Sequence, residues 1–268
     1  MLFKKDIIFK SSLVEGVGAS LASFKIIREN KSILFFYIIP FLLNIILLSA
    51  LIYLTFVNIV PMLQNYFDGD AWYIKLLYKL IKPILLILLL FITTMIYGFV
   101  GNILCSPFLD TLSQKTQETV SGTKINIPFS LKRSSENIIR TFKNLFKMLA
   151  LVAIVSLLSM LFIPIPVIGH VFYSALGYIT ASFILGLQFL DYPLERKRYT
   201  FIEKLKITWK FKYAAIGLGL SFLIVSMIPI LGFLGINMGV MGASIIFEKN
   251  ISSTLLENNI NSRDIVPL

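Results

Sequence analysis

The sequence predicts an all-α integral membrane protein with two spanning helices, two helical hairpins and long cytoplasmic helical extensions. Of its 268 residues, 57% are hydrophobic and only 15% are charged, whereas soluble domains average about 45–50% apolar and about 25% charged residues. The mean hydropathy is +0.83. Long uncharged runs alternate with basic segments, as spans and loops do in membrane proteins. We interpret residues 1–268 as a single membrane domain that ends in a polar tail over 248–268.

Two apolar segments are long enough to cross a bilayer. Ser32–Val60 and Pro83–Ser106 contain no charged residue, and each exceeds the ~20 residues that a helix needs to cross ~30 Å of hydrocarbon. Pro40 lies inside the first segment and should kink it, because proline removes a backbone hydrogen bond. We therefore expect two spanning helices here.

Four further apolar segments form two pairs, and each pair is predicted to be a helical hairpin. Their joints, IPIPVIGH and IPILGFLG, contain the Pro and Gly of tight turns. The arms are short: one of them would extend only about 24 Å as a helix, less than the ~30 Å hydrocarbon core. The sequence is compatible with two interpretations: hairpins that turn inside the bilayer, or six ordinary spans. The four segments are Lys147–Ile163, Val167–Leu190, Tyr213–Ile228 and Ile230–Phe247.

The distribution of charge sets the expected orientation. The net charge is +11, and Lys and Arg gather before Ser32 and within 101–147 and 191–212, while the loop over 65–82 carries Asp68 and Asp70. The positive-inside rule then places both termini and both long basic segments in the cytoplasm. Anionic lipid headgroups, not nucleic acid, are the expected counter-charge. The sequence thus predicts a multi-pass protein of the inner (plasma) membrane whose partners include the lipid bilayer.

Several function classes are disfavoured by what the apolar segments contain. Apart from Lys147 at the start of one segment, none of them carries Asp, Glu, Lys or Arg, which argues against a carrier that uses an intramembrane carboxylate. A single Cys105 and a single His170 give no ligand set for a Cys/His metal site. No catalytic motif is found, so we expect no enzyme, no metal and no cofactor. The polar residues in apolar context either bond between helices or line a pore; they are Asn44, Asn102 and Asn237.

Two amphipathic stretches follow apolar segments. SPFLDTLSQKTQE comes directly after the second span, where Ser106 can cap a new helix with Pro107 in its first turn. Asp110 would then lie where the helix dipole favours a carboxylate. We expect a helix to restart there, beyond the bilayer. The second stretch, Thr200–Lys212, is expected to be a helix with one face formed by Phe201, Leu205, Thr208 and Trp209.

Four stretches carry a family resemblance. They are IIPFLLNIILL with Pro40 and Asn44, GNILCSPFLDTLSQKTQE with Asn102, Pro107, Phe108 and Asp110, LQFLDYPLERKRYTFIEKL with Asp191, Tyr192 and Pro193, and MIPILGFLGINMGVMGAS with Pro229 and Gly242. In this order they resemble the CysZ sulfate-permease family, which belongs with the etoposide-induced-protein-like membrane proteins. The resemblance covers residues 16–247. It implies two spanning helices with two partly penetrating hairpins, a homo-oligomer, and sulfate uptake that supplies cysteine biosynthesis.

The chain departs from the family at one motif. A family Gly-Leu-Arg motif just before the first span is associated with sulfate binding, and alignment on the proline of that span places Ser32, Ile33 and Leu34 there. Leu34 therefore stands in place of the family's arginine. A helix N-terminus still offers backbone N–H groups to an anion, and Arg28 and Lys31 supply nearby charge. The anion-binding residues expected from the sequence are Arg28, Lys31, Ser32 and Ile33.

The expected function is therefore a permease or channel for a small inorganic anion, with sulfate the first candidate. The alternative is a membrane scaffold or organisation protein of the same fold that transports nothing. It would bind partners and give no flux.

Overall fold

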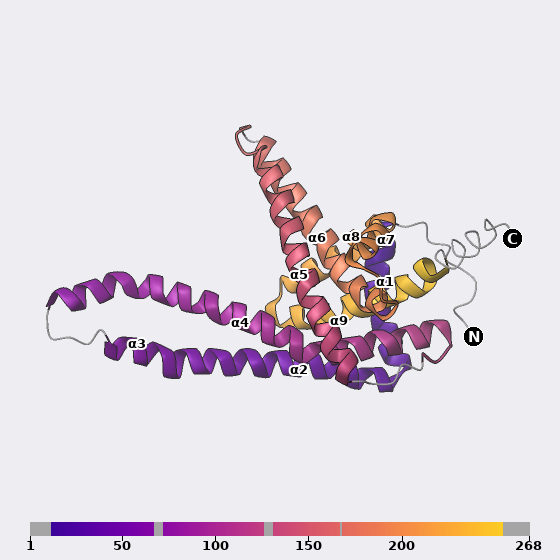
Figure 1. Cartoon of the computed structure of the whole chain (residues 1–268), viewed down its shortest axis with the longest axis horizontal. Helices are drawn as coiled ribbons and strands as arrows, with labels where there is room; N and C mark the ends of the chain where they lie inside the picture. The colour runs from indigo at the N-terminus through magenta and orange to yellow at the C-terminus, as the bar shows by residue number, and fades with distance from the viewer. Residues whose placement is uncertain (1–11, 67–71, 126–130, 167, 254–268) are drawn as a thin grey trace. The chain divides into compact units, whose positions relative to one another are not determined.

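The computed structural model describes residues 12–66, 72–125, 131–166 and 168–253, and every regular element in those ranges is a helix (Figure 1). This confirms the all-α prediction. In chain order the elements are α1 (Leu13–Glu29), α2 (Lys31–Leu54), the π-helical η1 (Thr55–Ile59), α3 (Val60–Tyr66), α4 (Trp72–Ser121), α5 (Leu131–Met160), α6 (Ile168–Arg196), α7 (Phe201–Lys210), α8 (Lys212–Ser226), α9 (Pro229–Ile246) and the π-helical η2 (Phe247–Ile251).

Within the described ranges, four helical stretches are long and apolar enough to cross a membrane, so the chain is a multi-pass membrane protein. They are Lys31–Met62, Lys79–Ser121, Ile168–Arg196 and Leu231–Ile251. A fifth candidate combines α7 and α8, which meet at a bend of 94°. The apolar part of α5, Phe146–Met160, is shorter than a span. The two predicted hairpins are present as α5–α6 and α8–α9, while the number of full crossings stays a prediction.

The chain divides into two compact units, of which the smaller is Ile38–Pro107. We call it the hairpin unit, because most of α2 runs beside most of α4 in it (Figure 1). Its exposed side chains include Ile46, Leu88 and Phe91. Large apolar surfaces of this kind mark contact with a partner or a membrane. Here they suit lipid, since the helices beneath them are long enough to span.

The larger unit, the bundle unit, comprises the described residues of Met1–Tyr37 and Phe108–Leu268. Helix α8 packs against α1, α6 and α9. Its buried side is made of small and aliphatic residues such as Ala214, Ala215 and Leu218. These helices form the core against which the basic segments are held.

Glycine lets these helices approach backbone to backbone. A Cβ on Gly186 of α6 would lie 2.1 Å from the carbonyl oxygen of Ala215 on α8. A Cβ on Gly217 of α8 would lie 2.3 Å from the carbonyl oxygen of Leu13 on α1. Neither space admits a larger residue, so the small residues of α8 fix its distance from both neighbours.

The structure corrects two expectations at the helix ends. The helix predicted to restart at Ser106 does not: α4 runs unbroken from Trp72 to Ser121, through Pro107. Proline in a helix interior removes one hydrogen bond, but packing holds the helix on both sides of it. Cys105 is buried in the hairpin unit and Leu109 in the bundle unit.

The second correction concerns α7. Thr208 is fully buried, whereas Trp209 is 60% exposed. The two side chains therefore do not share a face, and Trp209 lies on the outer side of the helix.

Candidate functional site

The break between α1 and α2 is the place where the sequence predicts an anion site. Asn30 connects the two helices. The side-chain Oδ1 of Asn30 accepts a hydrogen bond from the Ser32 N–H at 3.2 Å, and the Asn30 carbonyl accepts one from the Ile33 N–H at 3.0 Å. An Asn in this position satisfies N–H groups that a helix start leaves free. Asn30 thus both ends α1 and begins α2.

The four predicted anion-binding residues are not equally placed for a ligand. Arg28, in the last turn of α1, and Lys31 and Ser32, which open α2, are exposed. Ile33 is fully buried, and its N–H is already bonded to Asn30. The break therefore presents two cations and one hydroxyl to solvent, while Ile33 packs into the bundle unit.

A third cation lies beside the second turn of α2. The ammonium of Lys115, on α4, is 5.2 Å from the centroid of the Phe36 ring. Cations are attracted to aromatic faces at this distance. No local pattern predicts this neighbour, because Lys115 is one of several polar residues on an amphipathic stretch and is far from Phe36 along the chain.

Two of the family-motif carboxylates bind basic side chains of the bundle unit. Arg196 on α6 donates from Nη1 to the carbonyl oxygen of Asp110 at 2.9 Å, and the same nitrogen is 3.3 Å from Asp110 Oδ1. It also donates from Nη2 to Ser113. Ser113 in turn is 2.7 Å from Ser244 on α9. Since Ser244 donates its own proton to the Val240 carbonyl, Ser113 is the donor between the two serines.

The second motif carboxylate, that of Asp191, is paired with a buried lysine. Lys204 on α7 is 1% exposed, and its ammonium donates to Asp191 Oδ1 at 2.5 Å and to Glu195 Oε2. A buried cation is tolerated only when it is paired and hydrogen-bonded. The Asp110–Arg196 pair thus joins α4 to α6, and Lys204 joins α7 to α6 through Asp191 and Glu195. The sequence could place Asp110 and Asp191 in motifs, but not their partners.

In the hairpin unit, Asn44 joins α2 to α4. Its Nδ2 donates to the Pro40 carbonyl at 2.7 Å and to Cys105 Sγ at 3.2 Å, and Tyr97 donates its hydroxyl proton to Asn44 Oδ1 at 2.8 Å. Gly101 lies opposite, where a Cβ would be 3.4 Å from Asn44 Oδ1. Of the two roles that the sequence left open for Asn44, bonding between helices is confirmed.

In the bundle unit, Asn237 also forms a hydrogen bond between two helices. It is buried on α9 and donates from Nδ2 to the Tyr37 carbonyl of α2 at 2.6 Å. The side chain of Asn102 lies outside the described residues, so its role stays a prediction.

The remaining family-motif positions serve packing and helix ends. Pro193 and Pro40 are buried, Phe108 and Tyr192 are partly buried, and Pro107 is exposed. Pro229 is the first residue of α9, where proline is favoured. A Cβ on Gly242 of α9 would be 2.9 Å from the Ser20 nitrogen on α1, so this glycine allows a close helix crossing.

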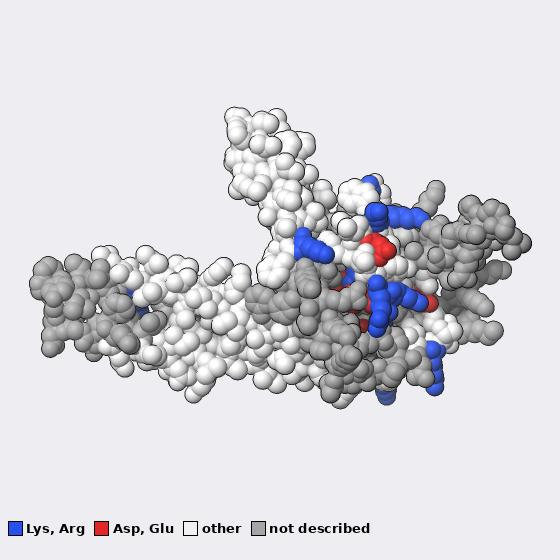
Figure 2. Space-filling model, in the orientation of Figure 1, with Lys and Arg blue, Asp and Glu red and all other residues white. Residues whose placement is uncertain are grey.

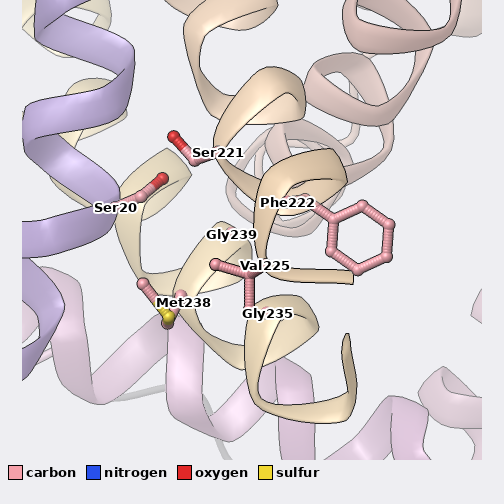
Figure 3. A pocket seen from close by; sticks show the side chains of 7 residues that line it. All are labelled: Ser20, Ser221, Phe222, Val225, Gly235, Met238 and Gly239. Atoms are coloured by element: carbon pink, nitrogen blue, oxygen red, sulfur yellow. The ribbon is translucent and has the colours of Figure 1, made fainter. Parts of the chain in front are cut away.

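A small pocket lies between α1, α8 and α9, lined by Ser20, Ser221, Phe222, Val225, Gly235, Met238 and Gly239 (Figure 3). It has no room for a water molecule. Both of its hydroxyls donate within their own helices, Ser20 to Gly16 and Ser221 to Gly217. The pocket is therefore an irregularity of close packing and not a ligand site.

One buried carboxyl group lies near the start of α1. Glu15 is buried, and Asn250 of η2 donates a hydrogen bond to its Oε1. Burial raises the pKa of Glu15 above its ordinary value, and the Asn250 hydrogen bond, a hydrogen bond from the Ser12 backbone and the charge of Lys249 oppose that rise only in part. The group ties α1 to the end of the last helix.

Comparison with known proteins gives a consistent result. The family model described as "Sulfate transporter CysZ/Etoposide-induced protein 2.4" matches residues 19–236. Similar proteins named sulfate transporter CysZ occur in Vibrio parahaemolyticus (25% identical over 78% of this chain and 84% of that protein), in Vibrio atlanticus (21% over 91% and 96%) and in Pseudomonas aeruginosa (24% over 80% and 87%). The similarity thus runs through both units.

Proposed function

This chain belongs to the sulfate transporter CysZ/etoposide-induced protein 2.4 family, and we propose that it is a permease or channel that carries sulfate across the inner (plasma) membrane and feeds sulfur assimilation. One observation carries the proposal. The similarity to proteins named sulfate transporter CysZ covers 91% of this chain and 96% of the relative from Vibrio atlanticus. The shared part therefore extends over nearly the full length of both proteins.

The composition of the spans supports transport of an anion that contacts charged side chains of the protein only at the helix ends. The apolar windows of the candidate spans hold few charged residues, and in the hairpin unit Thr55 bonds to Thr93 and Tyr97 to Asn44. The lysines and arginines gather on the bundle unit, while the middle of the hairpin unit is uncharged on the face drawn in Figure 2. A sulfate dianion is attracted by such a basic region on the cytoplasmic side of the membrane.

We place a contact of the anion with the protein at the break between α1 and α2, on the cytoplasmic side of the membrane. Its cations are Arg28 and Lys31, and the hydroxyl of Ser32 is exposed beside them. Ile33 contributes no side chain, because it is buried. Exposed cations bind an anion weakly and release it quickly, which suits a site where the imported anion passes into the cytoplasm.

Orientation and assembly complete the proposal. The positive-inside rule supports cytoplasmic termini and a cytoplasmic position for both long basic segments. The resemblance to the family supports a homo-oligomer. The scaffold alternative gains nothing from the relatives, since each of the three is named as a transporter.

Growth of a bacterial strain that lacks its own sulfate uptake tests the proposal in cells. With this chain the strain should grow on sulfate as sole sulfur source, and growth on cysteine should be the same with or without it. Growth on sulfate should be slower with Arg28→Gln/Lys31→Gln than with the matched pair Lys25→Gln/Lys124→Gln. Cells that contain the inserted protein yet do not grow on sulfate would overturn the proposal.

A further inference from the structure

The elbow between α7 and α8 has an unusual outer surface. Helix α7 begins at a capping box in which Thr200 and Glu203 exchange hydrogen bonds, and it turns by 94° into α8. Its inner side is fixed by the buried Lys204 and Thr208. The orientation of α7 on the bundle unit is therefore set, and so is the set of residues that faces outward.

That outward face is apolar where a water-facing helix would be polar. Ile202, Trp209 and Tyr213 are 63%, 60% and 51% exposed. Trp209 is held in place by an edge-to-face contact with Phe183 on α6, at 5.7 Å between ring centroids. Rigid, exposed aromatic side chains of this kind are typical of the boundary between lipid and water.

Three cations border these side chains. The Lys212 ammonium lies 5.1 Å from the Trp209 ring centroid and 5.3 Å from that of Tyr213, and Lys206 and Lys210 are exposed on α7. Lysines at an interface extend their charge to the headgroup level while their methylene chains lie along apolar surface. Charge and apolar surface thus meet on one side of the elbow.

We propose that this elbow, made of Ile202, Lys206, Trp209, Lys210, Lys212 and Tyr213, binds the phosphate headgroup of an anionic phospholipid, with Ile202 and Trp209 at the level of the upper acyl chains. Charge complementarity selects this occupant: the chain carries net +11, and a basic amphipathic helix with apolar residues opposite the core lies in the plane of an anionic interface. The inference is independent of what the protein transports.

Bromine quenching of tryptophan fluorescence tests the elbow directly. The chain has two tryptophans, so Trp72→Phe leaves Trp209 as the only reporter. The purified full chain is placed in bilayers whose phosphatidylglycerol or phosphatidylcholine carries brominated acyl chains. We expect both lipids to quench Trp209, and phosphatidylglycerol to be enriched there at least about threefold at low salt.

Two variants with the same change of charge give the control. Lys210→Gln/Lys212→Gln should bring the enrichment of phosphatidylglycerol close to one, whereas Lys25→Gln/Lys124→Gln should leave it unchanged. Equal quenching by the two lipids in the parent protein would overturn the proposal. So would the absence of quenching by either lipid, since it would mean that water or a second copy of the chain covers Trp209.

Discussion

The ammonium of Lys204 on α7 lies 2.5 Å from a carboxylate oxygen of Asp191 on α6, in a site where the lysine is 1% exposed. Asp191 opens the Asp-Tyr-Pro segment of the family resemblance. This motif residue therefore holds a basic helix onto the bundle unit. Its role in the structure is one of fixing α7, together with Glu195.

Removing the lysine should destabilise the protein strongly. Lys204→Met leaves two carboxylates without their cation, and we expect a loss of about 3 kcal/mol in the free energy of unfolding. Lys206→Met, on the exposed side of the same helix, should change it by less than about 0.5 kcal/mol. Thermal unfolding in detergent measures both variants.

A combined variant separates the charge from the packing. Lys204→Met/Asp191→Asn/Glu195→Gln removes the whole charged group, so it should recover much of the stability lost by the single variant. If the triple variant is less stable than Lys204→Met, the account of a buried ion pair is wrong.

The glycines of α6 give a matched pair for the close approach to α8. Gly186→Ala places a Cβ 2.1 Å from a backbone oxygen of Ala215, whereas the space around Gly177 on the same helix is open. We expect Gly186→Ala to lower the free energy of unfolding by about 1–3 kcal/mol. We expect Gly177→Ala to leave it unchanged or to raise it. Similar unfolding temperatures for the two variants would contradict the packing described here.

The link between α2 and α4 should be measurable as a coupling energy. Asn44→Ala and Tyr97→Phe each remove one side of the hydrogen bond between them. In membrane proteins such bonds couple by about 0.6 kcal/mol on average, up to about 1.7 kcal/mol. A double-mutant cycle on unfolding in detergent should give a value in this range. A coupling of zero would show that the two side chains act independently.

Much of the fold was predictable, because its strongest signals are local. Runs of apolar residues without charge predict α2 and α4, and the Ile-Pro joints predict α5–α6 and α8–α9 as hairpins. Asn44 could be chosen because a lone amide in an apolar run requires a partner.

The candidate site was less predictable, because it depends on contacts between distant segments. Lys204 lies in a basic stretch that the sequence places at the surface, and its burial follows from Asp191 and Glu195 on another helix. The unbroken course of α4 through Pro107 likewise depends on packing that no local pattern records. Trp209 looked like part of an inner face, and only the position of α7 shows it facing outward.

The raised pKa of Glu15 predicts a pH dependence of stability. In the unfolded chain this group titrates near 4.5, and burial raises its pKa in the folded protein. Its contribution is therefore complete below pH 4.5 and is lost as the pH rises through the higher folded value. Glu15→Gln should unfold at a temperature that varies less with pH over this range than the wild type does. Parallel curves for the two proteins from pH 4 to 8 would contradict the assignment.

Sulfate uptake by the purified protein in liposomes tests the central claim most directly. The account predicts that labelled sulfate enters vesicles that contain the protein faster than empty vesicles prepared in parallel. It also predicts slower entry with Arg28→Gln/Lys31→Gln than with Lys25→Gln/Lys124→Gln. Sulfate entry no faster than in empty vesicles, from protein that is folded and inserted, would contradict the claim that this chain is a sulfate permease.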